Sequence, residues 1–111
     1  MFIAMNRFKI ETGSEGAFET LWKERESHLK DTAEFEEFKL LRGPVDEEGG
    51  YTLYASHTTW SSRAAFEAWT KSVSFRKAHE NAGKSDIQYL GHPQLETFET
   101  VDGTFLSADA A

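Results

Sequence analysis

The sequence contains no cysteine among its 111 residues and only two prolines. Without thiols, the chain can form neither a disulfide framework nor a thiolate metal site. No run approaches the roughly 18 consecutive apolar residues of a membrane-spanning helix, and the first residues lack the basic stretch and apolar core of a secretory signal. We therefore expect a cytoplasmic protein that does not insert into a membrane.

Basic residues are also scarce, with 12 Lys and Arg against 19 Asp and Glu and a net charge of -7. Nucleic-acid binding draws much of its affinity from Lys and Arg contacts to phosphates, so we expect no nucleic-acid partner. Aromatic residues are abundant, and they include nine Phe and three Trp. This is more apolar surface than a small monomer easily buries, which points to a partner, a ligand, or both.

The first half of the chain shows two kinds of hydrophobic period. The opening MFIAMNRFKI alternates with period two and predicts a strand. Ser14, after a glycine that ends this strand, is the expected N-cap of an amphipathic helix over about residues 14–29. FEEFKLLR and YTLYASHTTW then predict two strands of a hairpin, joined by a turn in GPVDEEGG that includes Pro44.

The second half predicts two helical stretches and a last strand. Ser61 or Ser62 can cap a helix in SSRAAFEAWT, and SVSFRKAHENAG predicts another helix that closes near Gly83. PQLETFETV predicts the last strand. The order is βαββαβ, so we expect one α+β domain with a ferredoxin-like fold over residues 1–103, and a flexible tail at 104–111. Because such a fold leaves one sheet face bare, we also expect a homodimer.

Asn6 is the odd residue in the opening strand. The residues that share its face are otherwise apolar: Phe2, Ala4, Phe8 and Ile10. A buried carboxamide must be hydrogen-bonded, so Asn6 either ties down nearby backbone or serves a ligand. Spacing alone leaves both alternatives open.

Two residues of the later helices carry the same ambiguity. His79 lies on an apolar helix face. Counted from Phe75 at position i, this face has Ala78 at i+3, His79 at i+4 and Ala82 at i+7. A core histidine is the commoner outcome of such spacing, but a neutral imidazole beside small alanines also suits the ligation of a flat group such as haem iron. Trp69, on the preceding helix, is either core filling or a pocket wall.

These residues occur in motifs that resemble the IsdG-type haem-degrading monooxygenases, within the antibiotic biosynthesis monooxygenase superfamily of dimeric α/β barrels. The resemblance covers nearly the whole chain. Its motifs are MFIAMNRF at the start, WSSRAAFEAW from Trp60 to Trp69, and WTKSVSFRKAH from Trp69 to His79. The combination of an opening-strand Asn-Arg with Trp and His at these separations is more specific than any one of the residues.

The resemblance implies an activity and a role for each site residue. It makes His79 the proximal axial ligand of the haem iron, Asn6 the distal hydrogen-bond donor, and Trp69 the bulky group that presses on the porphyrin so that it ruffles. Asn6 and Trp69 would thus be catalytic as well as haem-binding. Haem is then both cofactor and substrate, and O2 with external electrons opens its ring to give a bilin and free iron.

Other features are less determined by the resemblance. Arg25 is a possible partner for the haem propionates, or a solvated face residue. His28, His57 and His92 rank below His79 as ligands, and residues 84–93 could form a flap over the haem. The chain has no GxGxxG-type nucleotide site, so electrons would come from a separate reductase or another reductant.

Two other functions remain open at this point. One is a cofactor-independent monooxygenase of the same fold that acts on quinols or polyketides and does not need His79. The other is a protein that binds or transfers haem without degrading it, since ligation alone requires no turnover.

Overall fold

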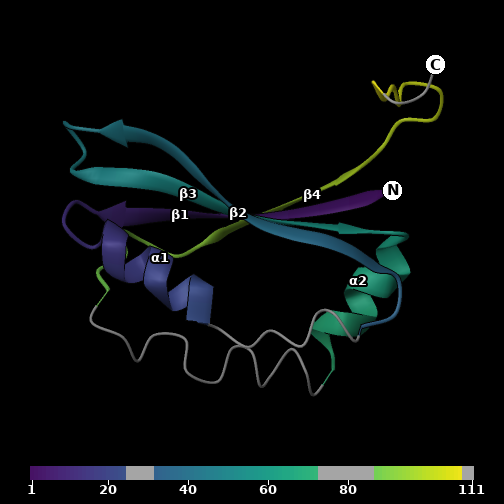
Figure 1. Cartoon of the computed structure of the whole chain (residues 1–111), viewed down its shortest axis with the longest axis horizontal. Coiled ribbons are helices and arrows are strands. Elements are labelled where there is room, and N and C mark those ends of the chain that lie inside the picture. The colour runs from purple at the N-terminus through teal and green to yellow at the C-terminus, as the bar shows by residue number, and fades with distance from the viewer. Residues whose placement is uncertain (25–31, 73–86, 109–111) are drawn as a thin grey trace.

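The computed structural model describes residues 1–24, 32–72 and 87–108 of the chain. Its elements are β1 (Phe2–Glu11), α1 (Glu15–Glu24), β2 (Phe35–Asp46), β3 (Tyr51–Trp60), α2 (Arg63–Thr70) and β4 (Gln94–Glu99). The strands form one antiparallel sheet in the order β2-β3-β1-β4. Both helices lie against the same face of this sheet, at opposite ends (Figure 1). This is the ferredoxin-like α+β fold that the sequence predicts.

The alternation of β1 is confirmed. Phe2, Ala4, Phe8 and Ile10 are all buried on the face that the helices cover. Asn6 shares this face and is half-buried. Period two in the sequence therefore places the apolar side chains correctly, because one face of the strand packs against helices and the other does not.

The end of β2 differs from the prediction. The strand continues through Pro44 to Asp46 and does not stop before the GPVD stretch. A register shift between Arg42 and Val45 absorbs the irregularity. Since β2 is at the edge of the sheet, a proline that cannot donate a hydrogen bond is tolerated there. Pairing with β3 therefore keeps residues 43–46 in the strand, although their sequence is typical of a turn.

Glycines make the rest of this hairpin possible. A Cβ on Gly43 would lie 3.1 Å from the carbonyl oxygen of Leu53, so a larger residue would push β2 away from β3. The turn itself is confined to residues 47–50. Gly50 adopts a φ of +72° there, a conformation that residues with a Cβ rarely adopt.

The predicted helix starts agree with the structure, and the predicted ends are only partly described. The Ser62 hydroxyl accepts a hydrogen bond from the backbone N–H of Ala65 at 3.2 Å and caps α2. The carbonyl of Ser14 accepts from the N–H of Phe18 at 3.0 Å, as an N-cap residue does. The expected extension of α1 to residue 29 and the expected helix that closes near Gly83 lie outside the described residues.

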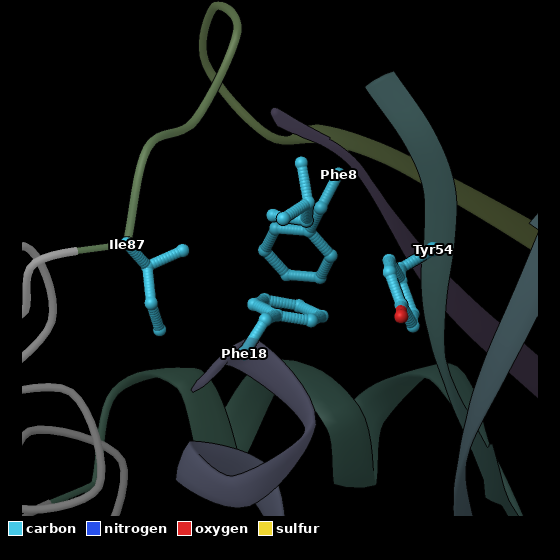
Figure 2. Packing of buried hydrophobic residues seen from close by; sticks show 5 residues of the cluster. Phe8, Phe18, Tyr54 and Ile87 are labelled. Atoms are coloured by element: carbon cyan, nitrogen blue, oxygen red, sulfur yellow. The ribbon is translucent and has the colours of Figure 1, made fainter. Parts of the chain in front are cut away.

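The covered face carries two separate hydrophobic clusters. One consists of Phe2, Ala4, Trp60 and Ala65, with Phe35, Phe66 and Trp69 packed against it. The other consists of Phe8, Ile10, Phe18, Tyr54 and Ile87, with Leu21, Trp22, Leu40 and Tyr89 packed against it. Figure 2 shows the second cluster, where the Phe18 ring of α1 lies against Phe8 and beside Tyr54. Each helix thus covers one end of the sheet.

Part of the segment expected to be a flap is anchored to the sheet. The backbone N–H of Leu90 donates to the carbonyl of Lys9 at 2.8 Å, and the N–H of Glu11 donates to the carbonyl of Gln88 at 2.9 Å. Ile87 is buried in the second cluster. Residues 87–90 therefore belong to the packed domain rather than to a flap, while residues 84–86 lie outside the described residues.

Within residues 1–24, 32–72 and 87–108, no helix is long and apolar enough to cross a membrane. Beyond β4, the chain runs away from the sheet on the side opposite the helices (Figure 1). Leu106 in this stretch is 89% exposed. The domain limit at residue 103 and the flexibility of the tail stay predictions.

A polar network fastens α1 to the sheet. Glu19 accepts a hydrogen bond from the buried Tyr54 hydroxyl at 2.5 Å and two from the Arg42 guanidinium, at 3.0 and 3.1 Å. The bonds from Arg42 and Tyr54 lower the pKa of the Glu19 carboxyl. Burial, together with the bond to Glu19, raises the pKa of Tyr54 to about 12. The network therefore favours charged Glu19 and neutral Tyr54.

This network predicts an acid-dependent stability difference for Glu19→Gln. A pKa lowered on folding contributes stability above the unfolded value of about 4.3, and that stability is lost as the pH falls below it. Glu19→Gln should therefore unfold at lower urea concentration than the unmodified protein at pH 7, and the gap between the two midpoints should narrow at pH 3.5. Glu24→Gln makes the same charge change on the same helix, and its urea midpoint should not differ in this way from that of the unmodified protein. A gap that is equal at the two pH values would contradict the prediction.

Candidate functional site

The candidate site is a cross-strand row in the middle of the covered sheet face. Asn6 of β1 pairs directly with Ser56 of β3, so their side chains project from the same face. Leu40 of β2 continues the row beyond Ser56, and Leu95 of β4 continues it beyond Asn6. Asn6 and Ser56 are both half-buried, so each remains accessible to a ligand.

Asn6 and Ser56 belong to neither hydrophobic cluster. The Trp60 cluster under α2 begins at the neighbouring residue of the same face, Ala4, and the Phe18 cluster under α1 begins on the other side, at Phe8. Asn6 and Ser56 therefore form a polar pair between two apolar clusters, in a row whose outer members are Leu40 and Leu95. A flat ligand lying on it would contact apolar side chains at both ends and polar groups in the centre.

The Asn6 carboxamide makes no hydrogen bond to another residue within the described ranges, and the same is true of the Ser56 hydroxyl. Asn6 therefore does not tie down nearby backbone there, which was one of its two alternatives. A carboxamide on an otherwise apolar face needs a partner. Since Asn6 is half-buried, that partner is water or a ligand.

Trp69 forms a wall at the α2 end of the row. Its ring packs against Trp60 with centroids 5.6 Å apart, and it is half-buried. Trp60 pairs with Phe2, four residues from Asn6 along β1. At about 3.3 Å per strand residue, these two rows are about 13 Å apart.

A second aromatic wall, made by Trp22 and Phe38, crosses the row near its β2 end, because Trp22 packs against Phe8 whereas Phe38 lies in the row of Ala4 and Thr58. Trp22 of α1 stacks on Phe38 of β2, with centroids 5.5 Å apart and planes inclined by 13°. Phe38 pairs with Thr58, in the row next to Ser56. This stacking joins two segments that are distant in the chain, so no local sequence pattern indicates it.

The remaining predicted site residues fall into two groups. His79, Arg25 and His28 lie outside the described residues, so their predicted roles are not tested by the structure. His57 pairs with Met5 and therefore faces the opposite side of the sheet from Asn6. His92 is exposed just before β4. Neither His57 nor His92 is placed to reach a ligand beside Asn6.

Two surface hollows lie away from this row. One, of about 470 Å³, is at the β2–β3 turn and is lined in part by Asp46, Glu47 and Glu48. The other, of about 230 Å³, lies between Met1 and the chain after β4. The first is acidic, and neither hollow includes Asn6 or Ser56 in its lining. Among the described residues, no group of three or more His, Asp or Glu side chains is suited to hold a bare metal ion.

The four-stranded antiparallel sheet with helices on one face defines a class of small ferredoxin-like α+β proteins. Residues 1–81 match the family model described as antibiotic biosynthesis monooxygenase. The chain belongs to this family.

The individual relatives include haem-degrading proteins and a cofactor-independent oxygenase. The chain is 28% identical over 109 residues to a staphylobilin-producing heme oxygenase of Staphylococcus haemolyticus, covering 96% of this chain and 97% of the relative. It is also similar to the structure of the heme-degrader MhuD of Mycobacterium tuberculosis with two hemes bound in its active site (27% identity, TM-score 0.68, 91% of this chain and 96% of the other). SnoaB, a cofactor-independent oxygenase of Streptomyces nogalater, shares the fold at 18% identity (TM-score 0.65, 89% and 91%).

Proposed function

We propose that the protein is a haem-degrading monooxygenase, which opens the porphyrin ring with O2 and external electrons to give a bilin and free iron. The observation that carries the proposal is the Asn6 carboxamide, which has no hydrogen-bond partner among the described residues and lies on a sheet face beside two aromatic walls. The relatives in Staphylococcus haemolyticus and Mycobacterium tuberculosis support haem as the ligand.

The described residues fit one side of a haem pocket. The row of Asn6 and Ser56 offers polar groups at its centre, Trp69 offers aromatic surface on its α2 side, and Trp22 offers aromatic surface near its β2 end. A flat apolar macrocycle with a polar ligand at its centre has a matching pattern. His79, assigned by the resemblance, would hold the iron from the other side.

Bound haem would supply the iron that activates O2 and the porphyrin carbon that is oxidised. In this chain, Asn6 would donate a hydrogen bond to the small ligand on the sheet side, in a dry pocket where such a bond is stronger than in water. Trp69 would press on the macrocycle, since distortion of the ring is one way in which a protein alters haem electronics. The aromatic walls would exclude bulk water from the reacting atoms.

The proposal includes an external reductase or another reductant as electron donor, and a cytoplasmic location. The sequence has no GxGxxG-type site for a nicotinamide or flavin. A chain of this size with a haem pocket therefore receives its electrons from outside.

The proposal also includes a homodimer built on the open sheet face. Apolar side chains on this face include Phe98, which is 48% exposed, and Ile3 beside it. The basic residues there have partners: Arg7 is paired with Glu96 at 2.5 Å, Lys39 is paired with Glu37 at 2.9 Å, and Lys9 lies over the Tyr51 ring. Packing two such faces together would remove this apolar surface from water, with Arg7 and Lys39 held in ion pairs and Lys9 against an aromatic ring.

Sedimentation equilibrium tests the dimer. We expect a mass twice the 12.6 kDa of the chain. Phe98→Glu, which would place an unpaired carboxylate in the interface, should shift the mass towards the monomer, while Phe105→Glu in the exposed tail should not. A monomeric unmodified protein at concentrations near 100 μM, well above the Kd of a stable dimer, would exclude this assembly.

A haem titration tests the proposed function. We expect the Soret band to shift when haem is added to the apoprotein, and then to disappear in air when ascorbate or a reductase is supplied. No shift on mixing would overturn haem binding and favour a cofactor-independent monooxygenase. A shifted band that survives the reductant would leave a haem-binding or haem-transfer protein.

A further inference from the structure

Ser56 differs from the other hydroxyl residues on the covered face of β3. Thr52 donates a hydrogen bond to Glu15 at 3.0 Å, and Tyr54 donates to Glu19 at 2.5 Å. Thr58 donates to the carbonyl of Ala4 at 3.2 Å. Each of these hydroxyls therefore fastens β3 to α1 or to β1.

The Ser56 hydroxyl has no such structural role in the part of the chain that the structure describes. It makes no hydrogen bond there, although its cross-strand partner Asn6 is polar and also makes none. Directly opposite residues in an antiparallel pair have Cβ atoms about 4.5–5.5 Å apart. At that separation, two short polar side chains can both reach one small ligand between them. Ser56 is half-buried, so its hydroxyl is accessible to such a ligand.

We propose that Ser56 is a second hydrogen-bonding residue of the pocket, which together with Asn6 binds the small polar ligand that shares the pocket with haem. The inference rests on the proposed function. The Ser56 hydroxyl both donates and accepts a hydrogen bond, whereas the Asn6 amide nitrogen only donates. The pair can therefore hold either an acceptor, such as bound O2 or azide, or a water molecule that both donates and accepts.

This arrangement gives Ser56 a different task from that of Trp69 or His79. Its hydroxyl is small and lies on the sheet, so it adds little to the apolar area that binds the macrocycle. Its loss should therefore leave haem affinity unchanged and weaken only the binding of the small ligand. The separation of these two affinities is the signature of the proposed role.

Azide binding to the ferric haem-loaded protein measures that role without turnover. The Kd of haem is first obtained by Soret titration, and the Kd of azide is then obtained from the change in the Soret band. We expect Ser56→Ala to weaken azide binding about fivefold, the factor that one neutral hydrogen bond represents, and to change haem affinity less than twofold. Ser56→Thr keeps the hydroxyl and should bind azide within twofold of the unmodified protein.

Two further variants make the test specific. In Asn6→Ala/Ser56→Ala, the combined loss of azide affinity should differ from the product of the single losses, because both side chains contact one ligand. Thr58→Val removes a hydroxyl that is already bonded to Ala4, so it should lower thermal stability and leave azide affinity within twofold.

The outcomes separate the two proposals. Unchanged azide affinity in Ser56→Ala, with haem bound normally, would overturn the role of Ser56 alone. An equal loss in Thr58→Val would also overturn it, because the effect would then come from disturbed packing. An unmodified protein that shows no Soret shift with haem would overturn the proposed function, and the role of Ser56 with it.

Discussion

Asn6→Ala should retain haem but lose ring opening, with a rate lowered about 100-fold or more. Asn6 supplies the carboxamide in the row at the centre of the covered face. This side chain has no hydrogen-bond partner within the described ranges. Removing one fixed donor that faces developing negative charge typically lowers a rate by 10² to 10³. The measurement is the initial rate of Soret loss with ascorbate in air, beside a haem titration that should give a Kd within about threefold of the unmodified protein.

Asn6→Asp is the matched control for this prediction. The carboxylate has nearly the same volume as the carboxamide, but it cannot donate a hydrogen bond when ionised. If donation is what matters, Asn6→Asp should be as slow as Asn6→Ala. Normal turnover by either variant would show that Asn6 is not the distal donor, even if haem remains bound.

The sequence predicts the fold well because each element has a local signal. The alternation from Phe2 to Ile10 places four side chains in the core, and Ser62 caps α2 as its position suggests. The signal fails at Pro44, where a residue typical of turns lies within β2. A proline is excluded from the centre of a sheet but allowed at its edge, and the sequence alone does not show which strand is at the edge.

The site is harder to predict from sequence because it depends on pairing between distant segments. Asn6 stood out since it interrupts an apolar alternation. Ser56 did not, because a serine in a Tyr- and Thr-rich strand is unremarkable until the register places it opposite Asn6. The network of Glu19, Arg42 and Tyr54 joins residues 23 and 35 positions apart, so no local pattern indicates it.

The assignment of His79 rests on the resemblance and the expected helical spacing, and it gives the second large prediction. His79→Ala should raise the Kd of haem by at least about 100-fold, since changes to residues that only support a metal ligand already cost 10- to 100-fold. The shifted Soret band should be lost at haem concentrations that saturate the unmodified protein. A neutral imidazole is the expected donor to iron, so the loss should be reversed in part by added imidazole.

The two histidines that the structure describes, His57 and His92, provide controls for His79. His57 faces the opposite side of the sheet from Asn6, and His92 is exposed before β4, so His57→Ala and His92→Ala should bind haem as the unmodified protein does. Imidazole rescue distinguishes a lost ligand from a disturbed fold, because a free ligand can replace a missing side chain but not missing packing. If His79→Ala kept both the haem affinity and the Soret position, another residue would ligate the iron. The polar row of Asn6 and Ser56 would then remain the sheet side of a pocket whose other side is held differently.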